Sequence, residues 1–126
     1  MVVLDTHAVV WWAGDAGRLS AKAAAAIDKA DRVGLPTIVL WETALLVRKG
    51  RLDLGMSAEE WAEKIQLIPR VAVLPLTPEI AVSADALRMH ADPADRFVIA
   101  TAMQHRSPVI TKDRSLRALK IVKTIW

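Results

Sequence analysis

The sequence predicts an α/β domain whose central, mostly parallel sheet is covered by helices on both faces. Short Val/Ile/Leu runs alternate with longer helix-like segments, and several of these runs are continuously apolar. A hydrophobic content of 53% in 126 residues is enough to build one sizeable core. We therefore expect a three-layer sandwich in which residues 1–126 form a single domain.

Five short apolar runs predict the strands of this sheet. In chain order they are VVL at 2–4, VGLP at 33–36, VAVLPL at 71–76, PVIT at 108–111 and IVKTIW at 121–126. Because helical segments separate them, most of the strands are expected to run parallel.

The segments between the strands predict helices. In chain order these run through residues 9–12 to an end near Gly14, and over 20–30, 37–50, 57–68, 77–89, 92–106 and 114–120. Most begin at a residue that commonly caps a helix N-terminus. The expected caps are Ser20, Thr37, Ser57 (with Glu60 three residues on), Thr77 (followed by Pro78) and Asp92 (followed by Pro93). Gly50 is the expected stop of the helix that starts at Thr37.

Composition excludes several kinds of chemistry. The chain contains no cysteine, so disulfides, thiolate zinc sites and cysteine nucleophiles are excluded. The formal net charge of +3 is compatible with a polyanionic partner but does not require one. Apolar runs are too short for a membrane span, and Asp5 and His7 interrupt the first of them, unlike a secretion signal. We expect a cytoplasmic protein without a membrane partner.

Two acids follow predicted strands. Asp5 comes directly after the strand at 2–4, and Asp113 follows the strand at 108–111 through Lys112. The functional crevice of a parallel sheet lies beyond the carboxyl ends of its strands, where both side chains would project. Taken singly, each is more simply interpreted as a helix N-cap or a turn residue.

Glu42 lies on an apolar face of its predicted helix. Its neighbours three and four residues away are Ile, Val and Leu, so no basic side chain pairs with it locally. Burying an ionised carboxylate without a partner is costly. A protonated glutamate and a distant arginine partner stay open as explanations, but a functional acid is favoured.

The DPAD stretch holds two further acids. Asp92 as N-cap and Asp95 in the first turn both complement the helix dipole. Asp95 also shares the apolar stripe of Val98 and Ile99, three and four residues on, so capping alone does not explain it. Asp92 needs no explanation beyond the cap.

Acids brought together in one crevice repel one another, and a divalent cation removes that conflict. Oxygen ligands without cysteine suit Mg²⁺ or Mn²⁺. Such an ion activates a water and stabilises the charge that develops on a phosphodiester during hydrolysis. The acids therefore favour metal-assisted phosphodiester cleavage.

Four motifs together resemble the PIN-domain family, and more closely its small bacterial VapC-type toxins. They are VVLDTH, WETALLVRKGRL, DPADRFVIATA and VITKD, in the order of the family and over essentially the whole chain. The resemblance implies a PIN-like, Rossmann-like fold and Mg²⁺- or Mn²⁺-dependent endoribonuclease activity. By position, Asp5, Glu42 and Asp95 would be the main catalytic and metal-binding acids, and Asp113 would complete the site.

The resemblance also implies partners. VapC-type toxins usually form homodimers, and a small antitoxin neutralises them and supplies the DNA binding. Thr6 and Thr111 match positions where the family often has a small hydroxyl residue, although a turn-forming role explains them equally well. Leu116 departs from the pattern, because relatives often carry an aromatic residue there.

Basic, histidine and tryptophan residues carry weaker predictions. Positive charge near Glu42 and Asp113 would suit RNA phosphates, and an ordinary solvated surface explains it equally well. These residues are Arg48, Lys49, Arg51, Lys112, Arg114, Arg117 and Lys120. The histidines lack metal-helix spacing, so surface or packing roles are expected. The five tryptophans are mostly core candidates, and an exposed Trp11 or Trp12 would mark a dimer or antitoxin contact.

Other functions fit the sequence less well. A receiver domain would need an acid pair after the first strand, and a haloacid-dehalogenase-like phosphatase would need an aspartate where His7 stands. The serious alternative is a non-catalytic PIN-like module that binds RNA or protein. Cleavage that is lost on mutation of the acids would separate it from a nuclease.

Overall fold

Five parallel strands form the central sheet, in the order β3-β2-β1-β4-β5. The structure is a computed structural model and describes residues 1–90 and 92–126. The strands are β1 (Val2–Leu4), β2 (Val33–Pro36), β3 (Val71–Leu74), β4 (Val109–Ile110) and β5 (Thr124–Ile125). All neighbouring pairs are parallel, which confirms the predicted sheet. Strands β3, β4 and β5 are shorter than predicted; Pro75 follows β3 and has no N–H to continue its ladder.

Helices fill the connections between the strands. They are α1 (Thr6–Gly14), the 3₁₀ turn η1 (Ala16–Arg18), α2 (Ala21–Lys29), α3 (Thr37–Arg48), α4 (Ala58–Gln66), α5 (Pro78–Ala86), α6 (Pro93–Gln104) and α7 (Arg114–Leu119). Ser20, Ser57, Thr77 and Asp92 each accept a hydrogen bond from a backbone N–H three residues on, as predicted. Local capping chemistry therefore sets these four helix starts.

The predicted cap of α3 was wrong. Thr37 is already helical, Pro36 is the cap residue, and no side chain caps this end. The Thr37 hydroxyl instead donates to the Leu74 carbonyl at the end of β3, 2.8 Å away. A contact between distant segments has replaced the local one. The helix ends at Arg48, close to the predicted stop, and Gly50 beyond it adopts a positive φ of 69°.

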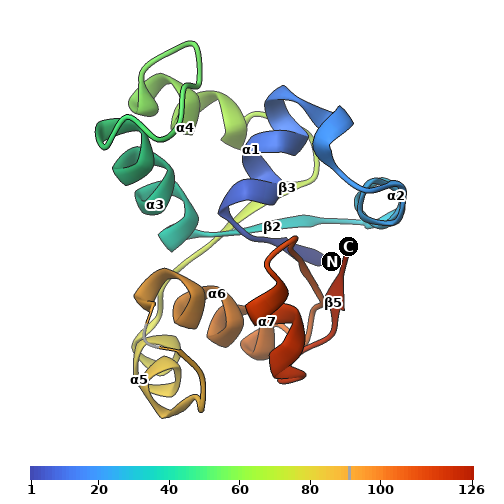
Figure 1. Cartoon of the computed structure of the whole chain (residues 1–126), viewed down its shortest axis with the longest axis vertical. Coiled ribbons are helices and arrows are strands. Elements are labelled where there is room, and N and C mark those ends of the chain that lie inside the picture. Colours follow the sequence, from blue (N-terminus) through green and yellow to red (C-terminus); the bar gives the residue numbers. More distant parts are fainter. Residues whose placement is uncertain (91) are drawn as a thin grey trace.

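The sheet lies between two layers of helices. Figure 1 shows α1, α3 and α4 on one side of it and α5, α6 and α7 on the other, which is the expected three-layer arrangement. The chain leaves β1 toward β2 but leaves β4 toward β5, so the connections diverge between β1 and β4. At such a switch point the loops beyond the carboxyl ends of the strands part and leave a crevice.

The core holds the strand side chains and the facing sides of the helices. Val3, Leu4, Val33, Leu35 and Val109 are fully buried in it. Leu116, which replaces the aromatic residue expected from the resemblance, is buried in the same cluster, so it fills this position as a core residue. Across residues 1–90 and 92–126, no helix is both long enough and apolar enough to cross a membrane.

Candidate active site

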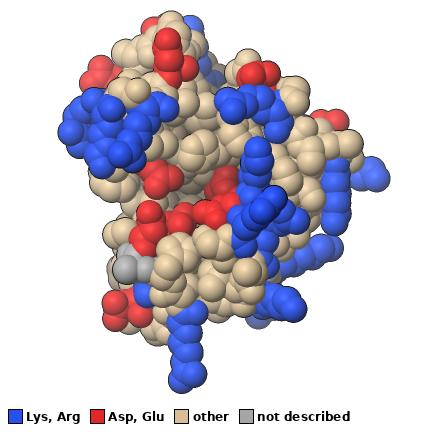
Figure 2. Space-filling view, in the orientation of Figure 1, with Lys and Arg blue, Asp and Glu red and all other residues tan. Residues whose placement is uncertain are grey.

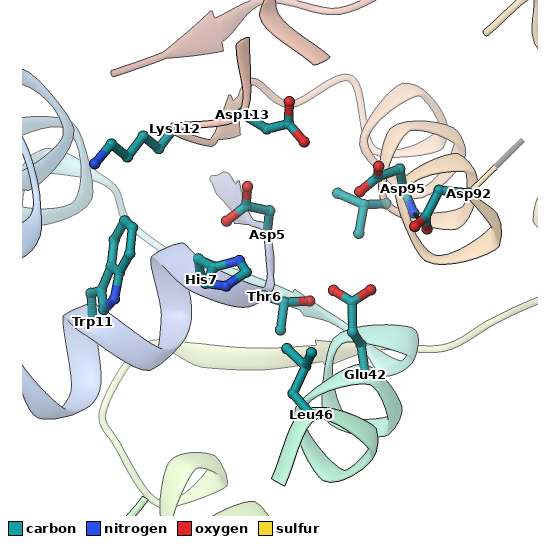
Figure 3. A pocket seen from close by; sticks show the side chains of 11 residues that line it. Asp5, Thr6, His7, Trp11, Glu42, Leu46, Asp92, Asp95, Lys112 and Asp113 are labelled. Atoms are coloured by element: carbon teal, nitrogen blue, oxygen red, sulfur yellow. Dashed lines mark hydrogen bonds between the residues drawn. The ribbon is translucent and has the colours of Figure 1, made fainter. Parts of the chain in front are cut away.

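A cavity of about 540 Å³ opens beyond the carboxyl ends of β1 and β4, and carboxylates dominate its polar lining. Those carboxylates belong to Asp5, Glu42, Asp92, Asp95 and Asp113. Figure 3 shows them turned toward a shared space, and Figure 2 shows red acidic atoms gathered in a hollow of the surface. The structure thus brings all four predicted acids to one cavity, together with Asp92, which we had expected only to cap α6.

Asp5 is held by the start of α1. It is the N-cap of this helix, and its Oδ1 accepts the Ala8 N–H at 2.8 Å, so the simpler interpretation of Asp5 is also correct. The side chain is buried, and burial raises its pKa from 3.8 to about 6, although hydrogen bonds from the Thr111 side chain and the Ala8 amide lower it. A proton or a cation is therefore favoured at this carboxylate.

Asp113 caps α7 in the same manner, and its Oδ1 accepts the Ser115 amide and hydroxyl at 2.7 and 2.6 Å. Burial raises its pKa, but these hydrogen bonds outweigh burial and hold the pKa below its ordinary value. Within the described chain, the capping bonds from Ser115 and Leu116 all reach Oδ1, so Oδ2 stays available to the cavity. Asp113 is the acid of the set that is most readily ionised.

Thr111 connects Asp113 to Asp5. Its fully buried hydroxyl accepts the Asp113 N–H at 3.0 Å, and the same side chain hydrogen-bonds Asp5. The residue therefore makes the turn after β4 and also fixes the two acids relative to each other. The turn-forming role and the role at the site, which the sequence left as alternatives, are combined in one hydroxyl.

Glu42 projects into the cavity from the first half of α3 and is half-buried. Burial raises its pKa; the Thr6 side chain hydrogen-bonds it and lowers the pKa, while Asp95 and Asp92 raise it further. Among residues 1–90 and 92–126 no basic group forms an ion pair with Glu42, so the distant arginine partner is excluded there. Thr6 and the exposed His7 lower the pKa of Glu42, but burial and the neighbouring acids prevail and leave it raised.

Asp95 reaches the cavity from the first turn of α6 and contacts His90. The His90 Nε2 lies 2.7 Å from its Oδ2. Burial raises the pKa of Asp95, and the His90 contact lowers it, but repulsion by Asp92 and Asp113 raises it again. We had expected a surface or packing role for His90 and so missed this contact. It comes from a loop, where no helical or strand periodicity signals which residues meet.

Arg96 was also missed, although it belongs to the DPADR motif. Its Nη1 donates to the carbonyls of Ala84 and Leu87, and its Nη2 donates to Met89. These carbonyls lie at and beyond the end of α5, and a guanidinium with several fixed donors reaches all three together. Arg96 therefore ties the loop that leads to His90 onto the first turn of α6.

The cavity concentrates negative charge that the protein does not neutralise. Asp5, Glu42 and Asp95 each have a raised pKa, with burial as the largest cause and carboxylate repulsion as a further one. In the described part of the chain, no three acidic or histidine side chains stand close enough to share one metal ion. Mg²⁺ and Mn²⁺ keep several waters and commonly bind directly through one or two carboxylates. The donor set therefore suits such an ion by chemistry, with the remaining acids reached through water.

Positive side chains border this acidic hollow on two sides. Figure 2 shows one blue group where Figure 1 places the C-terminal end of α3. Arg48 is the last residue of that helix, and Lys49 and Arg51 follow it in the sequence. A second group lies directly beside the acids on the opposite side of the hollow. Lys112 lines the cavity itself. The surface around the acids thus carries the charge that a polyanion would contact.

Comparison with known proteins places the chain among proteins of matching length. The family model described as PIN domain matches residues 2–122. Ribonuclease VapC22 of Mycobacterium tuberculosis is 36% identical, with 99% of this chain and 98% of the relative covered.

Two solved structures share the fold along the whole chain. FitAcB from Neisseria gonorrhoeae superimposes with a TM-score of 0.69 at 23% identity, covering 98% of this chain and 96% of that one. VapBC2 from Rickettsia felis, bound to a DNA fragment from its promoter, gives 0.69 at 13% identity over 98% and 97%. The five-stranded parallel sheet and its two helix layers are thus the architecture of these structures too. The chain belongs to the PIN-domain family and, within it, to the VapC-type proteins.

Proposed function

We propose that this protein, acting as a single PIN domain over residues 1–126, is a metal-dependent endoribonuclease and the toxin of a toxin–antitoxin pair. The observation that carries the proposal is the meeting of Asp5, Glu42, Asp95 and Asp113 in one cavity from separate segments of the chain. Membership of the VapC-type proteins supports the ribonuclease activity, as does the printed name of the relative from M. tuberculosis.

We propose that the cofactor is Mg²⁺ or Mn²⁺ and that these four acids are its ligands, directly or through water. Carboxylate oxygens are the donors that such ions prefer. A cation would also relieve the repulsion that raises the pKa of Glu42 and Asp95. When bound, the ion lowers the pKa of a coordinated water and stabilises the charge that develops on the phosphodiester.

The residues of the chain orient the acids and accept protons during hydrolysis. The helix caps at α1 and α7 fix Asp5 and Asp113 through their Oδ1 atoms, and Thr111 holds these two acids in register. Ionised acids opposite the substrate would accept the proton released by the attacking water. Thr6 and His90 orient Glu42 and Asp95 by hydrogen bonds. Fixed orientation matters because small misplacements of reacting groups cost large factors in rate.

RNA is the proposed substrate because positive side chains border the acidic cavity. Lys112 lines it, and the cluster at the end of α3 lies beside it. Such charges attract the phosphate backbone without reading its sequence. The acids alone would repel that backbone.

We also propose a homodimer and a small antitoxin that covers the cavity and supplies DNA binding. The titles of the similar structures describe VapBC2 with promoter DNA and a toxin-antitoxin complex from Klebsiella pneumoniae. On this chain, Trp41 is 53% exposed, whereas Trp11 and Trp12, which would have marked a contact only if exposed, are half-buried against the core. Exposed aromatic residues concentrate at interfaces, so Trp41 on α3 is the better candidate.

Cleavage by matched variants tests the proposal. Purified, partner-free protein is incubated with a structured RNA pool in Mg²⁺ or Mn²⁺ and in EDTA, beside Glu42→Gln and the control Glu59→Gln. Glu59 is an exposed glutamate in the first turn of α4, away from the cavity. We expect metal-dependent cleavage by the wild type and the control, and a cleavage rate that is lower by about 100-fold or more in Glu42→Gln.

Two outcomes would contradict this assignment. Equal cleavage by Glu42→Gln and the wild type would remove Glu42 from the site. No cleavage by folded wild-type protein in either metal would favour a non-catalytic module that binds RNA or protein.

A further inference from the structure

Trp11 stands in the wall between two cavities. It lines the acidic cavity and also a second cavity of about 310 Å³, to which Arg18 contributes. The ring is half-buried, with the His7 ring centroid at 5.6 Å and the Trp126 ring centroid at 5.7 Å from its own. Packing from two sides therefore holds Trp11 as a rigid surface next to the acids.

Two positive side chains lie over this ring. The Arg18 Cζ is 4.7 Å from the ring centroid, and the Lys112 Nζ is 5.5 Å from it. Figure 3 shows Lys112 extended away from the acids and toward Trp11. Cations within about 6 Å of an indole face are attracted by its negative electrostatic potential. The ring therefore limits where these two long side chains point.

Within the part of the chain that the structure describes, neither cation forms an ion pair with a carboxylate. Among residues 1–90 and 92–126, the ion pairs include neither Arg18 nor Lys112. Asp15 and Asp53 also line the second cavity, but neither is in an ion pair with Arg18 among these residues. Asp53 instead accepts the Gly55 amide at 2.8 Å. Both cations are solvent-exposed, so they can receive an incoming anion. Two cations that form no ion pair among the described residues thus lie against one aromatic ring beside the acidic cavity.

We propose that Arg18 and Lys112, positioned by Trp11, form a phosphate-binding subsite for the RNA backbone beside the bond that is cleaved. This inference rests on the proposed ribonuclease function, which brings a polyanion to the acidic cavity. Phosphates that flank the scissile one are repelled by the acids and need positive charge close by. Because the ring already restricts both side chains, binding costs them less conformational entropy than free surface lysines would lose.

Salt dependence of RNA binding measures the two phosphate contacts. A labelled single-stranded RNA is titrated with wild type, with Arg18→Gln/Lys112→Gln, and with the control Lys22→Gln/Lys29→Gln. The control removes two charges from α2, and neither residue lines the two cavities. Binding is measured in EDTA at 50 to 200 mM salt, with the RNA checked for integrity. Cleavage by the wild type in Mg²⁺ and Mn²⁺ is run in parallel.

Each phosphate contact to single-stranded RNA contributes about 0.7 to the slope of log affinity against log salt. The subsite variant should therefore lose about 1.4 from that slope. Between 50 and 200 mM salt, the factor by which the affinity of the variant falls should be about seven times smaller than the factor for the wild type. The Lys22/Lys29 control should keep the wild-type slope, because the expected loss of slope comes from the two phosphate contacts and not from the lower net charge.

The role of Trp11 is tested separately with two apolar replacements. Trp11→Leu keeps an apolar side chain against the core but offers no ring to the cations, whereas Trp11→Phe keeps a ring. We expect weaker RNA binding for Trp11→Leu and recovery of most of it for Trp11→Phe, with similar thermal stability for both. Equal RNA binding by folded Trp11→Leu and wild type would remove Trp11 from the subsite.

Failure of this inference is distinguishable from failure of the proposed function. If the wild type binds and cleaves RNA but the subsite variant keeps the full salt slope, only the subsite is wrong. If folded wild type neither binds nor cleaves RNA, both the subsite and the ribonuclease assignment are wrong.

Discussion

Replacing Asp5 by asparagine should make the protein more stable at neutral pH while abolishing its activity. Burial raises the pKa of Asp5 from 3.8 to about 6 in the folded state. The unfolded chain releases this proton near pH 4, but the folded chain retains it up to about pH 6. Ionised Asp5 therefore opposes folding, and stability that is fully present below pH 4 is lost as the pH rises through 6.

The size of this effect follows from the two pKa values. One pKa unit corresponds to about 1.36 kcal/mol, so ionised Asp5 costs the metal-free fold about 3 kcal/mol above pH 7. Asparagine stays neutral, and its side-chain oxygen can still accept the Ala8 N–H that caps α1. An unfolding entropy of about 2.1 cal/mol/K per residue then predicts a rise in Tm of roughly 10 °C.

Thermal unfolding of both proteins by circular dichroism, in EDTA from pH 4 to 8, measures the difference. We expect Asp5→Asn to melt higher at pH 8 and the two melting temperatures to converge at pH 4. Asp113→Asn is the matched control with the opposite sign, because hydrogen bonds hold the pKa of Asp113 below its ordinary value. A Tm difference for Asp5→Asn that is absent at pH 8, or equal at pH 4 and pH 8, would show that ionised Asp5 does not destabilise the fold.

Three further results are expected. His90→Ala should lower cleavage on the order of 10- to 100-fold and raise the metal concentration required, because Asp95 loses the imidazole 2.7 Å from its Oδ2. Unchanged metal dependence would contradict the orienting role of His90. Arg96→Lys should destabilise the fold by about 1–3 kcal/mol in urea unfolding, since one ammonium cannot reach the carbonyls of Ala84, Leu87 and Met89 together. An unchanged urea midpoint would show that these bonds make no net contribution to stability. Cleavage should fall as the pH drops through about 6, where Asp5 takes up its proton. Added Mg²⁺ should shift the midpoint of this pH dependence to lower pH, because metal and proton compete for Asp5. A midpoint independent of metal would argue against metal binding at Asp5.

The element pattern of this protein was accessible from sequence because its signals are local. Ser20, Ser57 and Thr77 each cap a helix at the predicted place, since the cap and the amide it satisfies lie three residues apart. The convergence of Asp5 and Asp113 was predictable from a rule of parallel sheets, which places strand carboxyl ends at one edge. Membership in the family came from the ordered motifs around these acids.

Contacts between distant segments were not accessible. Thr37 bonds the end of β3 across 37 residues of sequence, and that bond outcompeted the predicted cap. Trp41 is a large apolar residue and was expected in the core, yet its side chain is exposed, whereas the next residue of α3, Glu42, lines the cavity. The position of His90 against Asp95 depends on a loop, whose path no periodicity describes. These features depend on the strand order and the packing of helices, which no short motif encodes.

We propose above that the acidic cavity is a metal-dependent centre that cleaves RNA. The most direct measurement is single-turnover cleavage of one defined RNA by wild type and Asp95→Asn across a Mg²⁺ or Mn²⁺ titration, with circular dichroism to verify folding. We expect cleavage that rises with metal, stops in EDTA, and is lost in Asp95→Asn although Asp92 still caps α6. Cleavage by Asp95→Asn at the wild-type rate, or by the wild type in EDTA, would contradict it.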